Sequence, residues 1–409
     1  MSISPLAPIG FPSLEPIAGV QLSSVPAGIK YQGRDDVMLA VFESGTTVAG
    51  VFTQSMTAGA PVMISRSHLQ SRAAPKALIV NSGNSNAFTG KKGEQAVLET
   101  CQAVADAIDC QPQQVYVAST GVIGELIPKQ RIFDVIPQLV RELGDNNWEA
   151  SAKAIMTTDT FPKGATVKTQ INGKTITING FAKGSGMIAP DMATMLAFVY
   201  TDAAIPGTVL QALLAEANEQ SFNSITVDSD TSTSDTCLLF ATGNAGNDEP
   251  SHINDEGLQS FRIALAELMR DLAVQVVRDG EGATKLIKVR VTGAADHSAA
   301  KVVAKSIADS PLVKTAIAGE DANWGRVVMA VGKSGEMADR DKLRIKMGGV
   351  LITEQGELVE GYDEAPVATH LKGQEVTIET DLGIGDGSAT VWTCDLTHGY
   401  IQINADYRS

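Results

Sequence analysis

Thr194 lies where a rigid element could present a hydroxyl nucleophile. The segment before it, residues 183–193, contains two glycines and Pro190, and we therefore expect a bent loop there. The segment after it, residues 195–200, is a continuous apolar run typical of a strand buried on both faces. A small hydroxyl at such a junction is well placed for nucleophilic chemistry. Threonine is also common at strand starts without any chemical role, so spacing alone leaves both interpretations open.

Two loops upstream could supply hydrogen-bond donors to a developing oxyanion. An expected buried strand at residues 77–81 runs into a Ser/Gly/Asn loop at residues 82–90, a layout that can direct backbone N–H groups toward an anion or a carbonyl. An ordinary turn rich in Asn and Gly explains this loop equally well. A second short strand, residues 115–118, is followed closely by Thr120 and Gly121. A hydroxyl beside a glycine can offer two donors to one oxygen.

Three other polar motifs contain residue types that could carry chemistry. Glu281 stands between two glycines at the entrance of an expected strand, residues 286–291. The Asp/Ser/Thr-rich run at residues 225–236 could bind a cation or a polar ligand, but self-capping turns are the preferred interpretation. Residues 332–334 (GKS) resemble the end of a phosphate-binding loop. However, the preceding glycine, Gly325, is too far back for that motif, so no nucleotide site is expected.

Composition limits the class of protein. The chain has 409 residues, of which 44% are hydrophobic and 19% charged, as in ordinary globular enzymes. Its net charge of -15 argues against nucleic acid or an anionic membrane as a partner. The four cysteines form no CxxC pair and the five histidines have no ligand spacing, so we expect reduced thiols and no metal site. Without a signal-peptide pattern or an apolar run long enough to span a bilayer, a cytoplasmic location is expected.

The elements that must position these residues are expected to alternate between strands and helices. We expect residues 36–42 and 47–52 to form a hairpin, and residues 165–180 to form a second hairpin around the Asn172-Gly173 turn. A C-terminal strand is expected after Tyr400. Amphipathic helices are expected at about residues 94–108, 129–143, 148–156, 206–217 and 258–277. The length is sufficient for two domains or one large two-layer α/β unit.

Five long motifs, in this order along the chain, resemble the ornithine acetyltransferase (glutamate N-acetyltransferase) family of arginine biosynthesis. They are residues 81–90 (NSGNSNAFTG), 119–124 (STGVIG), 155–160 (IMTTDT), 183–195 (KGSGMIAPDMATM) and 279–285 (DGEGATK). Residues 319–326 (GEDANWGR) and the end of the chain around Asn404 agree with the same family. The resemblance extends from about residue 18 to the end of the chain.

The resemblance implies a two-domain α/β fold with stacked β-sheets flanked by helical layers, in a self-processing enzyme of the N-terminal-nucleophile type. The precursor would cut itself between Ala193 and Thr194. The products would be an α chain, residues 1–193, and a β chain, residues 194–409. The family's usual assembly is a heterotetramer of two α and two β chains.

The resemblance also assigns roles to individual residues. Thr194 would be the nucleophile, and Thr120 with Gly121 would form the oxyanion hole. Residues 157 and 158 are adjacent threonines, and the family's substrate contact is carried to Thr157, although Thr158 could take it if the alignment slips. The residues with an implied substrate contact are Thr157, Lys183, Thr194, Glu281, Asn404 and Ser409. Without the resemblance, Lys183 would be interpreted as a solvated loop lysine and Glu281 as a surface carboxylate.

The chemistry explains why a cut is needed before Thr194 can act. A free hydroxyl is a poor nucleophile, and a new α-amino group with a pKa of about 7.7–8.0 can accept its proton. The implied reaction moves an acetyl group from N-acetylornithine to glutamate through an acetyl-Thr194 intermediate, with ping-pong kinetics and without ATP, metal or another cofactor.

Several alternatives stay open at the level of sequence. A self-processing amidohydrolase or aminopeptidase would share the cut but pass the acyl group to water. A non-catalytic metabolite-binding or scaffold protein would remain one intact chain. The sequence does not decide whether acetyl-CoA is a second acetyl donor, or whether arginine or ornithine inhibits the enzyme.

Overall fold

The computed structural model describes residues 2–189 and 195–406, which form two compact units. The larger unit comprises residues 9–223 and 230–276, without the gap at 190–194. The smaller unit comprises residues 2–8, 224–229 and 277–406. These units are defined by how compactly the chain packs, so they differ from the expected α and β chains. The division between residues 193 and 194 stays a prediction.

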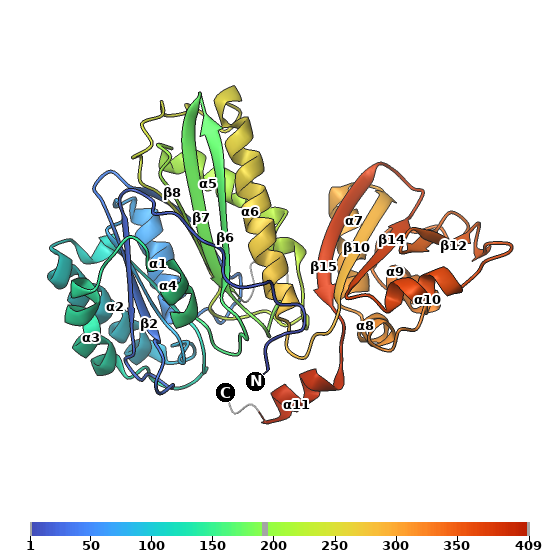
Figure 1. The fold of residues 1–409 in the computed structure, drawn as a ribbon, viewed down its shortest axis with the longest axis horizontal. Coiled ribbons are helices and arrows are strands. Elements are labelled where there is room, and N and C mark those ends of the chain that lie inside the picture. The colour runs from blue at the N-terminus through green and yellow to red at the C-terminus, as the bar shows by residue number, and fades with distance from the viewer. Residues whose placement is uncertain (1, 190–194, 407–409) are drawn as a thin grey trace. The chain divides into compact units, whose positions relative to one another are not determined.

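The larger unit contains two β-sheets stacked face to face (Figure 1). The four-stranded sheet has the order β1 (Val20–Val25), β2 (Val37–Phe42), β4 (Ala77–Asn81) and β5 (Val115–Ser119). The five-stranded sheet has the order β3 (Thr47–Phe52), β9 (Thr236–Ala241), β8 (Leu196–Thr201), β7 (Lys174–Lys183) and β6 (Lys163–Ile171). Aromatic rings join the sheets, because Phe42 of β2 stacks on Phe240 of β9 with 4.2 Å between ring centroids. Tyr200 of β8 extends this stack at 5.7 Å from Phe240.

Helices cover the outer faces of both sheets. On the four-stranded sheet, α2 (Gly90–Ile108) and α3 (Lys129–Arg141) bury an apolar cluster that includes Val97 and Ile136. On the five-stranded sheet, α6 (Gln259–Arg278) approaches β7 closely at Gly180, where an added Cβ would lie 2.8 Å from Leu272. The other helices of this unit are α1 (Ala60–Ser71), α4 (Trp148–Ala154) and α5 (Gly207–Glu219). The expected stacked sheets with helical layers are confirmed.

The smaller unit is built on one six-stranded sheet. Its strands, in order, are β13 (Glu357–Leu358), β12 (Val350–Glu354), β11 (Arg344–Met347), β14 (Glu375–Asp381), β10 (Leu286–Ala294) and β15 (Gly387–Cys394). Its helices are α7 (His297–Ala308), α8 (Pro311–Ala318), α9 (Trp324–Gly332), α10 (Ala365–Leu371) and α11 (His398–Asp406). Side chains such as Val289 of β10 and Val303 of α7 form its separate hydrophobic core.

Two expectations about strands are wrong. Residues 36–42 and 47–52 do not pair as a hairpin, because β2 pairs with β1 and β4 while β3 pairs with β9 in the other sheet. Both strands are mostly apolar, so the short connection between them does not determine which partner each one takes. The segment after Tyr400 is not a strand but part of α11, and Thr397 Oγ1 near its start accepts a hydrogen bond from the Gly399 N–H at 3.0 Å.

The hairpin around Asn172-Gly173 is confirmed. All of β6 pairs with β7, and the two turn residues have φ angles of 48° and 79°. Positive φ at both positions is what a two-residue turn between twisted strands requires. This hairpin matters for the site, because its second strand ends at Lys183.

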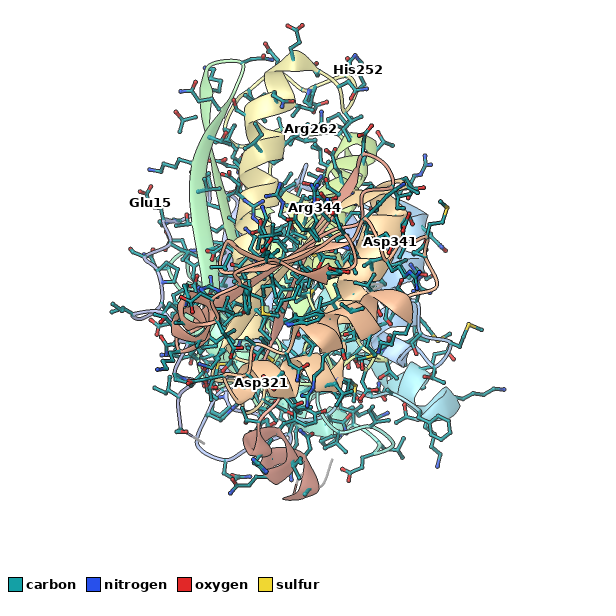
Figure 2. All side chains as sticks on the ribbon, turned by 90° about the vertical axis from the view of Figure 1, so that its right-hand side faces the viewer. Glu15, His252, Arg262, Asp321, Asp341 and Arg344 are labelled. Carbon is teal, nitrogen blue, oxygen red and sulfur yellow. The ribbon has the colours of Figure 1, made fainter. Side chains whose placement is uncertain are left out.

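Some polar side chains of the larger unit lie on its exterior. Figure 2 shows Glu15 and His252 projecting outward, and both are exposed. Within the described ranges, no helix is both long and apolar enough to cross a membrane.

Candidate active site

Two loops that follow neighbouring parallel strands lock together at the site. β4 and β5 pair in parallel, and a bridge joins Asn84 of the first loop to Thr120 of the second. Gly121 has a φ of 130°, and a Cβ there would lie 2.3 Å from the carbonyl carbon of Gly83. Only glycine fits such a conformation and contact without strain. The Ser/Gly/Asn loop therefore supports the position of Thr120 and Gly121.

Lys183 reaches Thr120 from the other sheet. It is the last residue of β7, it is buried, and its Nζ lies 3.4 Å from Thr120 Oγ1. The interpretation of Lys183 as a solvated loop lysine is therefore wrong. The structure thus brings together two residues that are 63 positions apart in the sequence.

A buried carboxylate organises the polar groups around Lys183. Asp159 accepts hydrogen bonds from Lys163 Nζ at 2.7 Å and from the Gly184 N–H at 2.7 Å. Its second oxygen accepts from the Thr157 N–H at 2.9 Å and lies 3.9 Å from Lys183 Nζ. Burial alone would raise the pKa of Asp159, but the two ammonium groups and these hydrogen bonds outweigh it and hold the pKa well below its ordinary value.

This carboxylate and its lysine were missed by sequence reasoning. Asp159 lies inside the IMTTDT motif, in which the family resemblance gives a role only to a threonine, and Lys163 lies outside all the motifs. The available signal was the spacing of four residues between an aspartate and a lysine, which is too common to indicate a site. The pair becomes informative only because both side chains are fully buried.

The expected substrate contact could be made by Thr157 or by Thr158, and the two threonines do not differ in burial class. Both threonines are partly buried, and the Thr157 N–H donates to Asp159. The assignment to Thr157 stays a prediction.

In the smaller unit, Glu281 and Asn404 lie together. Asn404 Nδ2 donates to Glu281 Oε2 at 2.8 Å, and Glu281 is only 8% exposed, so it is not a surface carboxylate. Glu281 and Gly282 lie in the connection between α6 and β10. This connection is held against the start of α11, because Thr397 Oγ1 donates to the Gly282 carbonyl at 2.7 Å. A Cβ on Gly282 would lie 2.4 Å from the Tyr400 nitrogen, so this close approach requires glycine.

Three expected site residues, Ala193, Thr194 and Ser409, lie outside the residues that the structure describes. The strand that follows Thr194 is described. Met195 is buried, and β8 runs from Leu196 between β7 and β9, as the apolar run predicts.

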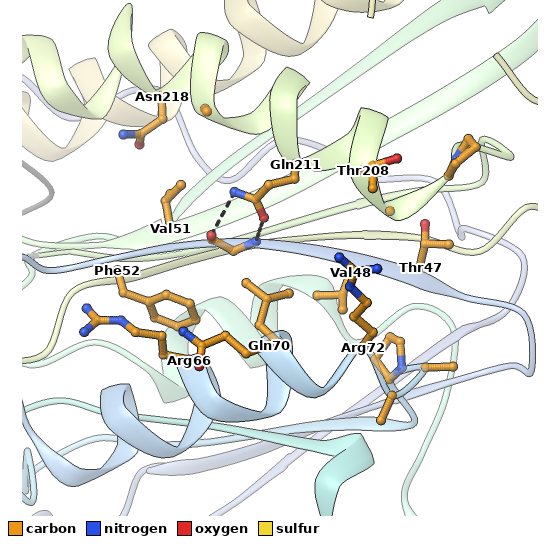
Figure 3. A pocket seen from close by; sticks show the side chains of 18 of the residues that line it. Thr47, Val48, Val51, Phe52, Arg66, Gln70, Arg72, Thr208, Gln211 and Asn218 are labelled. Carbon is orange, nitrogen blue, oxygen red and sulfur yellow. Dashed lines mark hydrogen bonds between the residues drawn. The ribbon is translucent and has the colours of Figure 1, made fainter. Parts of the chain in front are cut away.

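The larger unit also has a large pocket that lies away from Thr120 and Lys183. It has a volume of about 1160 Å³ and lies along β3 between α1 and α5 (Figure 3). The Gln211 side chain binds both backbone groups of Gly50 there, at 3.0 and 3.1 Å, which closes this part of the sheet edge. None of the expected site residues that the structure describes lines this pocket.

Comparison with known proteins identifies the family. The model of the ArgJ family matches residues 21–409. The chain belongs to the ArgJ family. This membership confirms the resemblance found in the five motifs.

Relatives in the ArgJ family match the full length of the chain. It is 58% identical to the "Arginine biosynthesis bifunctional protein ArgJ" of Gluconobacter oxydans, over 100% of this chain and 96% of the relative. It is 56% identical to the protein of the same name from Ruegeria pomeroyi, over 100% of this chain and 98% of the relative. A crystal structure of the arginine biosynthesis bifunctional protein argJ from Bacillus halodurans aligns with a TM-score of 0.50 and 45% identity, covering 52% of this chain and 100% of that one.

Proposed function

We propose that the chain is a self-processing acetyltransferase of arginine biosynthesis that moves an acetyl group from N-acetylornithine to glutamate. The acetyl group would be carried on Thr194, which becomes the first residue of the β chain after the cut. Membership of the ArgJ family supports this reaction, and so do the names of the full-length relatives.

The observation that carries the proposal is the buried contact between Lys183 and Thr120. It joins the end of β7 to the loop after β5, and in the sequence Lys183 opens the segment that leads to Thr194. A hydroxyl polarised by an ammonium group in a water-poor setting is a suitable donor to an oxyanion. The Thr120 Oγ and the Gly121 N–H would each stabilise the tetrahedral intermediate by roughly 3–4 kcal/mol.

The reaction passes through an acetyl ester on Thr194. The α-amino group of Thr194 takes the Oγ proton as Oγ attacks the acetyl carbonyl of N-acetylornithine. The C–N bond breaks, the proton passes to the departing amine, and ornithine leaves. The neutral amine of glutamate then attacks the acetyl ester, and its proton passes through the α-amino group to the departing Oγ. N-acetylglutamate leaves and the threonine hydroxyl is restored. One amide replaces another, so neither a metal nor ATP is required.

Substrate contacts are proposed from the family resemblance. Lys183 suits a substrate carboxylate and Glu281 suits the side-chain ammonium of ornithine, in both cases as charge-assisted hydrogen bonds. The hydrogen bond from Asn404 orients Glu281 for this role. Thr157 and the terminal Ser409 complete the proposed set.

Self-cleavage is supported by the length of a solved relative. The whole of the Bacillus halodurans crystal chain corresponds to about 213 residues of this one (0.52 × 409), close to the 216 residues (409 − 193) of the proposed β chain. We further propose a cytoplasmic α2β2 heterotetramer. Because the relatives are named bifunctional, we also propose acetyl-CoA as a second acetyl donor for glutamate.

The test is a transfer assay with N-acetylornithine labelled in its acetyl group. Label should appear in N-acetylglutamate only when glutamate is present, and initial rates at several concentrations of both substrates should give ping-pong patterns. Release of labelled acetate at the same rate without glutamate would instead identify a hydrolase. A second assay with acetyl-CoA and glutamate alone tests the additional donor.

A further inference from the structure

The turn that carries Glu281 has little rigidity of its own. Glu281 stands between Gly280 and Gly282, in the connection from α6 to β10. Gly282 has a φ of 74°, and glycine on both sides of Glu281 gives the backbone more conformational freedom than other residues would. One turn hydrogen bond, from the Ala283 N–H to the Gly280 carbonyl at 2.9 Å, spans this stretch. Contacts from elsewhere in the chain are therefore needed to fix the direction of the Glu281 carboxylate.

Asp395 supplies such contacts from the end of β15. It directly follows β15 and is only 2% exposed. Its Oδ1 accepts from the backbone N–H groups of Thr284 and Lys285, at 2.8 and 2.9 Å, and its Oδ2 accepts from Thr284 Oγ1 at 2.5 Å. The Asp395 N–H donates to the Lys285 carbonyl at 3.1 Å, which continues the pairing of β10 with β15 by one residue. One buried side chain therefore fixes the backbone between Glu281 and the sheet.

Thr397 holds a further point of the same turn. Its Oγ1 donates to the Gly282 carbonyl at 2.7 Å. Asp395 and Thr397 thus bind three backbone groups of the turn within four residues of Glu281. Asn404 acts differently, because it binds the Glu281 carboxylate itself. The backbone and the side chain of Glu281 are therefore held by separate residues.

Asp395 is itself held by a buried lysine. Lys314 of α8 is only 3% exposed, and its Nζ donates to the Cys394 carbonyl and, at 2.7 Å, to Thr393 Oγ1. The Lys314 carbonyl accepts from the Leu396 N–H at 3.3 Å. The peptide groups on both sides of Asp395 are therefore bound to one residue of α8, which makes Asp395 a fixed support for the turn.

We propose that Asp395 is a positioning residue for the recognition of the substrate ammonium group, and that it acts through the backbone that carries Glu281. This inference rests on the proposed function, in which Glu281 binds the side-chain ammonium of ornithine. Such charge-assisted hydrogen bonds are strong only at short distance and good angle, and a binding group must be held within about 0.5 Å of its productive position. Without Asp395 the Glu281 carboxylate can move further than this, so the ammonium is bound more weakly.

The test compares Asp395→Ala with a control in the same unit, Asp296→Ala. Asp296 lies beyond the opposite end of β10 and caps α7, where its Oδ1 accepts from the Ala299 N–H at 2.9 Å. Loss of either aspartate should lower the unfolding temperature. Only Asp395→Ala should raise the KM for N-acetylornithine, by about 10-fold or more. Its kcat should fall by less than about threefold, because the ammonium lies away from the reacting carbonyl.

Two further measurements separate positioning from a merely structural role. The first is the inhibition constant of N-acetylnorvaline, which has the carbon chain of N-acetylornithine without the ammonium group, and which Asp395→Ala should leave unchanged. The second is the double variant with Glu281→Gln. Because Asp395 acts through Glu281, adding Asp395→Ala to Glu281→Gln should raise the KM for N-acetylornithine little further.

Milder variants keep the proposal testable if Asp395→Ala does not fold. Asp395→Asn retains an amide oxygen that can accept from both backbone N–H groups, so its KM should stay close to that of wild type. Thr284→Val removes only the hydrogen bond to Oδ2 and should raise the KM for N-acetylornithine by about threefold. An unchanged KM in Thr284→Val would then overturn the proposal.

Other outcomes overturn the proposal without touching the proposed function. One is a folded Asp395→Ala enzyme with the wild-type KM for N-acetylornithine. Another is an equal loss of affinity for N-acetylornithine and N-acetylnorvaline, which would make Asp395 structural only. A Glu281→Gln enzyme with unchanged KM would instead remove the substrate contact on which the inference rests, and wild-type protein that transfers no acetyl group would refute the proposed function.

Discussion

Replacing Asp159 with asparagine should destabilise the larger unit strongly, because it removes the carboxylate from a fully buried ion pair. Lys163 Nζ lies 2.7 Å from Asp159, and both side chains are 0% exposed. Removing one partner of a buried pair costs about 3–5 kcal/mol. For a domain of this size that corresponds to a melting temperature lower by roughly 6–20 °C.

The assay is thermal and urea unfolding of a double-mutant cycle. It uses Asp159→Asn, Lys163→Met and the double variant in a Thr194→Ala background, so that every sample is one uncut chain. The double variant should cost less than the sum of the single changes by up to about 3 kcal/mol, because it removes both charges together. Glu15→Gln and Lys168→Met are the matched controls, since that pair has the similar distance of 2.8 Å but side chains 64% and 54% exposed.

The exposed pair should contribute less than about 1 kcal/mol. If Asp159→Asn lowers the free energy of unfolding no more than Glu15→Gln does, or if the cycle shows no coupling, the buried ion pair does not stabilise the larger unit as expected.

The dependence of stability on acid pH gives an independent check. The folded-state pKa of Asp159 lies below its unfolded value of about 3.9, so its stabilisation is fully present above that value and is lost as pH falls through the folded pKa. The unfolding free energy of Asp159→Asn should therefore fall less steeply in acid than that of the Asp159 parent.

Three further predictions concern the site itself. Thr194→Ala should give a folded, uncut and inactive chain, seen as one band on a denaturing gel where the wild type gives fragments of 193 and 216 residues (409 − 193); a cut and active variant would exclude Thr194 as the nucleophile. Thr120→Ala should lower kcat by about 10²–10³-fold with an unchanged unfolding temperature, and a large loss of stability instead would make Thr120 structural. Glu281→Gln should mainly raise the KM for N-acetylornithine in steady-state assays, and an unchanged KM would remove Glu281 from the substrate site.

Local features of the fold could be predicted from sequence because a few residues determine them. Asn172-Gly173 specified its turn, and the apolar spacing from residue 258 to 277 predicted a helix found at Gln259–Arg278. Strand partners could not be predicted in the same way. β2 and β3 are neighbours in sequence but belong to different sheets, because packing across the whole unit selects their partners.

The site was predicted in part. Thr120 and Lys183 came from family motifs, but their contact depends on two stacked sheets that no spacing in the sequence reveals. Asp159 was not predicted as a site residue, since aspartates among threonines and serines usually cap turns. Its burial, which decides its chemistry, is visible only in the folded chain.

The most direct test of the central claim is intact mass spectrometry of the mature protein, quenched after mixing with N-acetylornithine in the absence of glutamate. We expect a fragment that begins at Thr194 and carries the added mass of one acetyl group, which disappears when glutamate is added. An unmodified fragment in an enzyme that still transfers acetyl groups, or an acetyl group on the α chain, would contradict it.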